Sequence, residues 1–146
     1  MFIVNVEGAI FKDDKWLIIE RSKKEEHASG LLSIVGGKVE QEGNSSEILE
    51  RTVKREIYEE VDVIVKKDVT YIHSTSFVTD SDEHVVDIVF LCEYESGKAI
   101  AKSPDEVAAV YWMTAQQVYE HSNAPDYLRE SIKRAEDIKR AKFCNV

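Results

Sequence analysis

The order of elements along the chain predicts an α/β (α+β) fold in which helices cover both faces of a sheet. Two observations carry this prediction. Segments rich in Val, Ile, Thr, Tyr and Phe stand both before and after one clear amphipathic helix, and more helical sequence closes the chain. The 146 residues are enough to bury a hydrophobic core, so we expect a single domain over residues 1–146.

The first part of the chain contains three expected strands. Residues 2–11 alternate loosely between apolar and polar side chains, and residues 16–19 form a short apolar run. Residues 22–30 are polar and charged, so we expect a loop there. Residues 31–35 are apolar again, and we expect this strand to stop at Gly36-Gly37.

Residues 44–61 form the clearest expected helix. Asn44 is a good N-cap, and Glu47, three residues later, completes an Asx version of the capping box. Opposite charges at i,i+4 support the same helix: Glu47 with Arg51, Glu50 with Lys54 and Arg55 with Glu59. An apolar stripe at helical spacing consists of Leu49, Val53, Ile57 and Val61.

The second half of the chain begins with an expected hairpin. Residues 69–79 and 84–95 are rich in strand-forming side chains, and a polar turn joins them. Residues 107–113 form another short strand. Thr114 is expected to cap a short helix that reaches about His121, and Pro125 suits the first position of a last helix over about 125–142.

Composition and charge narrow the function classes. The formal net charge of −9 repels a phosphate backbone, so a nucleic acid polymer is not expected as a partner. A small phosphorylated substrate stays compatible with this charge, because a cation held by carboxylates reverses the local sign. No basic N-terminal segment or long apolar run is present, so we expect a cytoplasmic protein without a membrane span.

The two cysteines predict no disulfide framework. Cys92 and Cys144 form no CxxC pair. We expect one of them in the core and the other near the C-terminus.

Three acids on the expected helix are candidate metal ligands. Glu56, Glu59 and Glu60 stand at i, i+3 and i+4, so their side chains share one helical face. Three close carboxylates repel one another, and a divalent cation with a preference for oxygen ligands, such as Mg²⁺, removes that repulsion. A solvated acidic face is the simpler reading of most acidic runs.

The helical wheel weakens that simpler reading. At about 100° per residue, Glu60 falls inside the apolar stripe, and Glu56 lies roughly 20° from Leu49. Acids at the edge of a core-facing stripe need a partner, because an unpaired buried charge is costly. Arg55 is the neighbouring cation, expected near Glu59 and within reach of Glu47, and we interpret it as an orienter of the carboxylates.

These residues resemble the Nudix box. The family pattern is Gly, five residues, Glu, seven residues, and then Arg-Glu-hydrophobic-x-Glu-Glu-x-Gly-hydrophobic. Here Glu47 is followed by seven residues and then by residues 55–63 (REIYEEVDV), while residues 36–40 (GGKVE) resemble the family's glycine-rich loop. Residues 83–95 and 105–113 are similar to the elements that follow the box.

The chain departs from the family pattern at three places. Nine residues separate Gly37 from Glu47, where the family usually has five, which is a four-residue insertion. Asp62 stands where the family usually has glycine, and Val35 where proline is common. None of the three removes a carboxylate expected to bind metal.

The resemblance implies a fold and an activity. The fold is a Nudix-type α/β/α sandwich with a mixed β-sheet between helices. The activity is Mg²⁺-dependent hydrolysis of the diphosphate bond in a nucleoside diphosphate linked to a moiety X, with Mn²⁺ as a substitute, giving a nucleoside monophosphate and X-phosphate. The partner is then a small nucleotide-type substrate, on a monomer or a homodimer.

The resemblance also implies roles for residues. Glu59 is favoured as general base, and a further acid is expected outside the helix, with Glu106 first, Asp105 second and Glu83 third. The implied metal ligands are Glu56, Glu59 and Glu60, with Arg55 as their orienter, and the implied substrate-binding residues are Gly36, Gly37, Lys38 and Arg21.

Other functions fit parts of this pattern. A catalytically silent Nudix-like domain would bind a nucleotide or act as a regulatory domain. The acids that are intact at residues 56, 59 and 60 argue against this reading. An acidic helix that binds a basic partner leaves the glycine pair unexplained. An isomerase of phosphorylated isoprenoids would need more chain. The moiety X stays open among nucleoside triphosphates, dinucleoside polyphosphates, ADP-ribose and nucleotide sugars.

Overall fold

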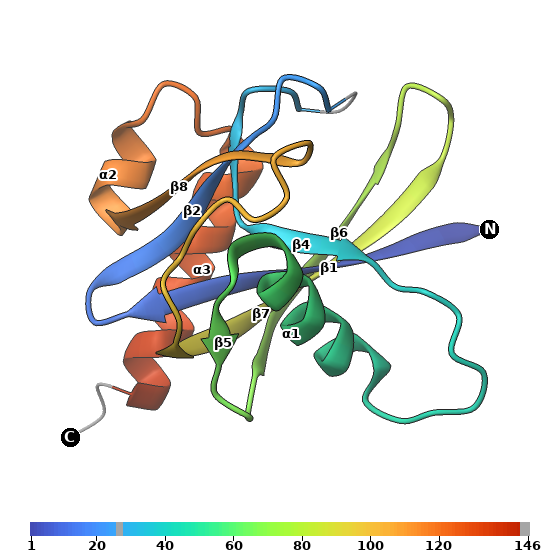
Figure 1. The fold of residues 1–146 in the computed structure, drawn as a ribbon, viewed down its shortest axis with the longest axis horizontal. Helices are drawn as coiled ribbons and strands as arrows, with labels where there is room; N and C mark the ends of the chain where they lie inside the picture. The colour runs from blue at the N-terminus through green and yellow to red at the C-terminus, as the bar shows by residue number, and fades with distance from the viewer. Residues whose placement is uncertain (26–27, 144–146) are drawn as a thin grey trace.

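A computed structural model describes residues 1–25 and 28–143 (Figure 1). The expected loop over residues 22–30 is therefore described only in part, and Cys144 lies outside the described residues. Cys92 is fully buried, as expected of a core thiol. No helix in the described part of the chain is both long and apolar enough to cross a membrane.

The described part of the chain is organised around one mixed sheet of eight strands. β1 and β7 run parallel along ten paired positions, from Phe2 opposite His84 to Phe11 opposite Glu93, whereas the other pairings are antiparallel. The strands are β1 (Phe2–Lys12), β2 (Lys15–Arg21), β3 (Leu32–Ser33), β4 (Val35–Lys38), β5 (Ile64–Val65), β6 (Thr70–Val78), β7 (His84–Ser96) and β8 (Val107–Thr114), and the helices are α1 (Ile48–Val61), α2 (Ala115–Glu120) and α3 (Asp126–Phe143).

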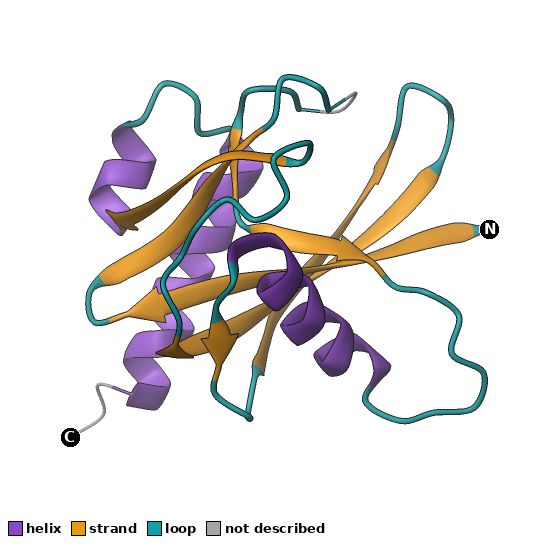
Figure 2. Ribbon diagram, viewed as in Figure 1, coloured by secondary structure: helices purple, strands orange, loops and turns teal. Residues whose placement is uncertain are grey.

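Helices cover both faces of this sheet (Figure 1, Figure 2). Successive side chains of β1 point to opposite faces, so Ile10 packs with Ile57 of α1, whereas Ala9 and Phe11 pack with apolar residues of α2 and α3 such as Leu128. Two separate hydrophobic clusters result, one on each side. The predicted α/β/α sandwich around a mixed sheet is confirmed.

The glycine pair lies inside a strand, so the prediction that a strand stops there is wrong. The apolar run expected over 31–35 forms two short strands, and the second of them continues through Gly36 and Gly37 to Lys38. Both glycines pair with β1, opposite Glu7 and Val6. The ladder with β1 holds the backbone extended, which overrides the turn preference of two adjacent glycines.

α1 starts four residues later than predicted. Glu47, not Asn44, is the N-cap residue; its φ of 56° is left-handed, and its side chain makes no capping hydrogen bond. The predicted pair of Glu47 with Arg51 is absent from the ion pairs of the described residues, because Arg51 reaches back to Glu42 and to the carbonyl of Ser46. The insertion before α1 therefore folds onto the helix through Arg51.

The later elements match their predictions closely. The β6–β7 hairpin and β8 are present, and Thr114 caps α2 with a capping box completed by Gln117. Pro125 immediately precedes α3, which begins at Asp126, one residue later than expected. The short strand β5 was not predicted, because two residues give no periodicity to detect.

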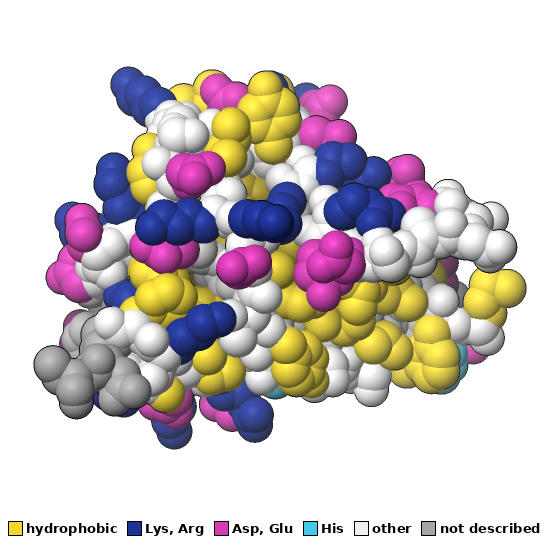
Figure 3. Space-filling view, turned by 90° about the horizontal axis from the view of Figure 1, so that it is seen from below, with side chains coloured by type: hydrophobic (Ala, Val, Ile, Leu, Met, Phe, Trp, Pro, Cys, Tyr) yellow, Lys and Arg dark blue, Asp and Glu magenta, His cyan; other side chains and the backbone are white. Residues whose placement is uncertain are grey.

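β6 forms a free edge of the sheet that exposes apolar side chains. Within the described residues it pairs with β7 alone. Phe77 and Val78 near its end are exposed, as is Phe2 at the start of β1. Figure 3 shows apolar side chains gathered on the face of the molecule seen from below. The choice between a monomer and a homodimer stays a prediction.

Candidate metal and phosphate site

Gly37 of β4 and Glu56 of α1 lie in contact where the helix packs on the sheet. A Cβ added to Gly37 would lie 2.4 Å from Cδ of Glu56 and less than 3 Å from both of its carboxylate oxygens. Side chains larger than hydrogen would therefore displace this carboxylate. The close packing explains in physical terms why a glycine suits position 37.

Glu60 is the buried acid of the site. It is 6% exposed, and its Oε2 has no hydrogen-bond partner within the described part of the chain. Burial, the charge of Glu106 and then that of Glu56 raise the pKa of Glu60 to about 9. The prediction that Glu60 lies inside the core-facing stripe of the helix is confirmed.

A loop fastened to the end of α1 brings in Glu106. The last carbonyls of a helix lack partners within the helix. Here the backbone N–H of Ile100 donates to Val61 at 3.1 Å, that of Lys102 donates to Glu60 at 2.9 Å, and Ser103 Oγ donates to Glu59 at 3.3 Å. This loop leads directly into β8, so Glu106 lies close enough to Glu60 for its charge to raise the pKa of Glu60.

Glu56 belongs to the same group of carboxylates. Burial is the largest cause of its raised pKa, the charge of Arg55 opposes that rise, and the charges of Glu59 and Glu106 add to it. Four acids, from α1 and from the start of β8, therefore influence one another. Such repulsion is relieved by a proton or by a cation.

Arg55 contacts three carboxylates. Its Nη2 lies 3.3 Å from Glu56 Oε1, its Nη1 lies 3.8 Å from Glu40 Oε2, and its Nε lies 3.9 Å from Glu59 Oε1. The expected reach toward Glu47 is replaced by the contact with Glu40. The Glu59 side chain is 57% exposed, which makes it the most accessible of the three helical acids.

The structure separates the three candidates for the extra acid. Glu106 lies beside Glu60, whereas Asp105 points away and pairs with Lys24 at 3.0 Å. Glu83 lies in the β6–β7 turn, where it accepts a hydrogen bond from Ser81 and donates its backbone N–H to Thr79. This placement favours Glu106 for the role of the further acid.

The two predicted substrate-binding cations stand at the ends of β2 and β4. Arg21 ends β2, contacts Glu25 at 3.2 Å and lowers the pKa of Glu60 through its charge. Lys38 ends β4 one residue after Gly37, and it is exposed. Both can meet the oxygens of a phosphate group at the edge of the site.

The chemistry of these residues fits a divalent cation. Across residues 1–25 and 28–143, no three His, Cys, Asp or Glu side chains are already arranged around one point. The unpartnered Oε2 of Glu60 and the mutual repulsion of Glu56, Glu60 and Glu106 are what a hard cation with a preference for carboxylate oxygens would relieve.

Two groups near the site escaped sequence reasoning. Glu40 follows the glycine pair in GGKVE and contacts Arg55, a contact that the sequence pattern does not reveal. Asn5 and Glu7 are polar residues that interrupt the apolar residues of β1, and that interruption was the available signal.

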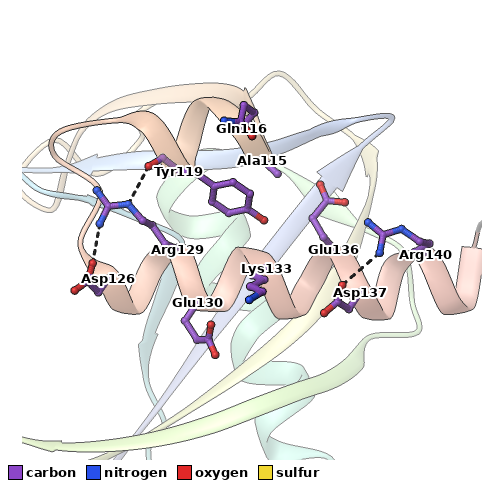
Figure 4. A pocket seen from close by; sticks show the side chains of 10 residues that line it. All are labelled: Ala115, Gln116, Tyr119, Asp126, Arg129, Glu130, Lys133, Glu136, Asp137 and Arg140. Carbon is purple, nitrogen blue, oxygen red and sulfur yellow. Dashed lines mark hydrogen bonds and ion pairs between the residues drawn. The ribbon is translucent and has the colours of Figure 1, made fainter.

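A separate surface groove of about 670 Å³ lies between α2 and α3 (Figure 4). Its arginines are already paired, Arg129 with Asp126 at 2.8 Å and Arg140 with Asp137 at 3.3 Å. None of the predicted site residues lines it. Its lining consists of Ala115, Gln116, Tyr119, Asp126, Arg129, Glu130, Lys133, Glu136, Asp137 and Arg140.

Comparisons with known proteins agree on the fold. The family model of the NUDIX domain matches residues 1–135. The MutT NUDIX hydrolase from Burkholderia pseudomallei is 25% identical with a TM-score of 0.78, over 92% of this chain and 98% of that one. The MutT protein from Methanosarcina mazei Go1 is 20% identical with a TM-score of 0.76, over 95% and 96%.

A third similar structure is the NUDIX domain of Shewanella oneidensis NrtR complexed with ADP ribose. It is 20% identical with a TM-score of 0.75, over 94% of this chain and 88% of that one. No curated protein sequence matches the chain. The fold and the family match define an enzyme of the pyrophosphohydrolase class. The chain belongs to the NUDIX family.

Proposed function

We propose that the protein hydrolyses the diphosphate bond of a nucleoside diphosphate linked to a moiety X, with Mg²⁺ as cofactor and Mn²⁺ as a substitute. The observation that carries the proposal is the buried Glu60, whose Oε2 has no partner among the described residues and which is surrounded by further carboxylates. In a folded protein such a group needs a proton or a cation. The products are a nucleoside monophosphate and X-phosphate.

Glu56, Glu59 and Glu60 of α1 would hold the cation, with Glu106 as the acid from outside the helix. When bound, a divalent cation neutralises charge on the phosphate oxygens and lowers the pKa of nearby water. Arg55 keeps Glu56 in place through the 3.3 Å contact. Arg21 and Lys38 would bind the phosphate oxygens, together with the backbone of Gly36 and Gly37, and the missing side chain of Gly37 leaves room for the Glu56 carboxylate.

Glu59 is the proposed general base, because it is the most exposed of the helical acids. Its carboxylate takes a proton from the attacking water as the water oxygen bonds to one phosphorus. The bond from that phosphorus to the bridging oxygen breaks, and the bridging oxygen leaves with the electron pair. Water is consumed once for each diphosphate bond cleaved.

The test is release of nucleoside monophosphate from a panel of nucleoside triphosphates, dinucleoside polyphosphates, ADP-ribose and nucleotide sugars. We expect release with Mg²⁺ and none with EDTA. Glu106→Gln should lower kcat/KM by about a hundredfold or more, because it removes a charge from the reacting centre. Asp105→Asn is the matched control and should keep wild-type turnover, because Asp105 pairs with Lys24 outside the acid cluster.

A silent nucleotide-binding domain is the second candidate. The solved NUDIX domain of NrtR, complexed with ADP ribose, has the same fold. This candidate predicts nucleotide binding without release of any product across the whole panel. Equal rates for the Glu106 and Asp105 variants would instead refute the assignment of the site.

A further inference from the structure

The loop that connects β7 to β8 carries a lysine whose ammonium group contacts α1. This loop spans residues 97–106 and runs beside the last turn of the helix (Figure 1). Lys102 Nζ lies 4.1 Å from the ring centre of Tyr58 and 3.4 Å from Oδ1 of Asp62. The proposed hydrolysis uses none of these three side chains, so their arrangement needs a separate explanation.

The end of α1 lacks a positive charge of its own. The last carbonyls of a helix give its C-terminal end a partial negative charge, which a nearby cation stabilises. α1 has no basic residue in its last turn, whereas Glu59 and Glu60 stand there and Asp62 is the C-cap residue. Lys102 therefore brings to this end, from outside the helix, the charge that both the helix dipole and the acids favour.

Asp62 joins the helix to the loop at a strained backbone position. Its φ of 61° is left-handed, which raises the free energy of residues other than glycine. A glycine would relieve this strain but would offer no carboxylate to Lys102. The loop also packs on this residue through its backbone, since a Cβ added to Gly97 would lie 2.5 Å from the carbonyl oxygen of Asp62. The contact with Lys102 therefore gives a physical reason for an aspartate at position 62.

A tight turn transmits the position of Lys102 to Glu106. Ser103 Oγ donates to a carbonyl oxygen of α1 at 3.3 Å. The carbonyl oxygen of Ser103 accepts from the backbone N–H of Glu106 at 2.9 Å and from that of Val107 at 2.8 Å. Pro104, inside this turn, has a fixed φ. Few backbone torsions are therefore free between Lys102 and Glu106, so the acid follows the lysine when the loop moves.

The ammonium group of Lys102 is held from two sides, by an aromatic ring and by a carboxylate. The side chains of Lys102 and Asp62 are 40% and 41% exposed, so the ion pair alone contributes little. A cation over an aromatic ring and an exposed ion pair each shift an equilibrium by about two- to fivefold. Together the two contacts favour the docked loop by about tenfold over a loop without the ammonium group.

We propose that Lys102 is a positioning residue, whose contacts with Tyr58 and Asp62 hold the 97–106 loop on α1 and thereby fix Glu106 beside the acids of the helix. This inference rests on the proposed function, in which Glu106 is the acid supplied from outside α1. Lys102 touches neither the substrate nor the reacting atoms. It acts on the rate through Glu106 alone.

Limited proteolysis measures the docking of the loop without any reaction. Cleavage by trypsin after Lys98 requires the loop to leave α1, because the neighbouring Ile100 donates its N–H to Val61 at 3.1 Å in the docked state. Lys102→Met keeps the aliphatic stem but removes the charge, and it should release fragment 1–98 from the metal-free protein about tenfold faster. Lys102→Arg keeps the cation and should stay within about twofold of the wild type. Lys67→Met, at an exposed lysine between β5 and β6, is the charge-matched control and should cleave at the wild-type rate.

A substitution of Tyr58 tests the contribution of its ring. Tyr58→Leu should raise the cleavage rate by about threefold, because the ammonium group loses its aromatic partner. In a Lys102→Met background the same change should add nothing, because the cation is already absent and the two side chains act through one contact. An added increase in the double variant would contradict the assigned contact.

Turnover separates a positioning role from a direct one. Lys102→Met should lower kcat about tenfold and leave KM within about twofold, because a displaced acid slows the chemical step while the substrate-binding Arg21 and Lys38 stay in place on the sheet. In a Glu106→Gln background the same substitution should change kcat by less than about twofold, because the group through which Lys102 acts is already gone.

Three results would overturn the proposal. The first is a wild-type cleavage rate in Lys102→Met, the second is an equal acceleration in Lys67→Met, and the third is a full further loss of kcat when Lys102→Met is added to Glu106→Gln. Normal hydrolysis together with wild-type cleavage in Lys102→Met refutes this inference alone. Faster cleavage in Lys102→Met, with no hydrolysis of any substrate by the wild type, refutes the proposed function alone.

Discussion

Replacing Glu60 with glutamine should stabilise the metal-free protein above neutral pH. Glu60 is buried, and its pKa rises from 4.5 to about 9. A carboxyl group whose pKa is raised by folding stabilises the folded state fully below its unfolded pKa, and this contribution is lost as pH rises toward the folded value. The free energy of unfolding of the metal-free wild type therefore falls between about pH 4.5 and pH 9. The neutral amide of the variant does not titrate, so the variant does not undergo this loss.

The size of the effect follows from the linkage between protonation and folding. Each pH unit in this window costs the wild type about 1.4 kcal/mol per proton. Between pH 4.5 and pH 7.5 the free energy of unfolding thus falls by about 4 kcal/mol relative to Glu60→Gln. For a chain of this length, such a difference corresponds to a Tm higher by roughly 10 °C in the variant.

Thermal unfolding followed by circular dichroism in EDTA, at pH 5.5, 7.5 and 9, measures this effect. The Tm of the variant minus that of the wild type should increase with each step in pH. The variant should also lose hydrolytic activity with Mg²⁺. A difference in Tm that stays constant across the three pH values would refute the reasoning, because it would show that Glu60 does not titrate in this range. A wild type more stable than the variant at pH 9 would refute it as well.

Two further predictions concern backbone positions. Gly37→Ala should lower kcat/KM by about a hundredfold, because the new Cβ would displace the Glu56 carboxylate. The control Gly43→Ala should lose about 1 kcal/mol of stability, because Gly43 has a left-handed φ of 67°, but it should keep its kcat/KM, because the added Cβ meets nothing within 4 Å; equal losses of kcat/KM would contradict the argument. Asp62 has a left-handed φ of 61°, so Asp62→Gly should unfold in urea with a free energy about 1 kcal/mol higher than Asp62→Ala, and equal values would exclude backbone strain there.

Most of the fold could be predicted because local patterns agree with the tertiary structure. The helical wheel placed Glu60 in the core-facing stripe, and Glu60 is buried. The start of α1 was mispredicted because Asn44 is a good cap by type, yet Arg51 binds the preceding loop and the helix begins at Ile48. Capping preference is a local signal, and here a longer-range contact outweighs it.

The candidate site was predictable only where one element carries it. The three acids of α1 follow from helical spacing, but the position of Glu106 depends on a loop bound to the end of α1, and its candidacy came from the family resemblance. The hydrogen bond from Asn5 to Asp87 was missed entirely. It exists because β1 and β7 lie parallel in one register, and no local pattern relates residues 82 positions apart.

The loop that closes the end of α1 makes the acid cluster part of one local unfolding unit. Ile100 and Lys102 donate their amide protons to carbonyls of α1, so those protons exchange with solvent only when the loop separates from the helix. The same separation carries Glu106 away from Glu60. Hydrogen exchange at these two amides therefore reports how often the cluster opens, and any ligand that bridges Glu60 and Glu106 slows that exchange without touching either amide.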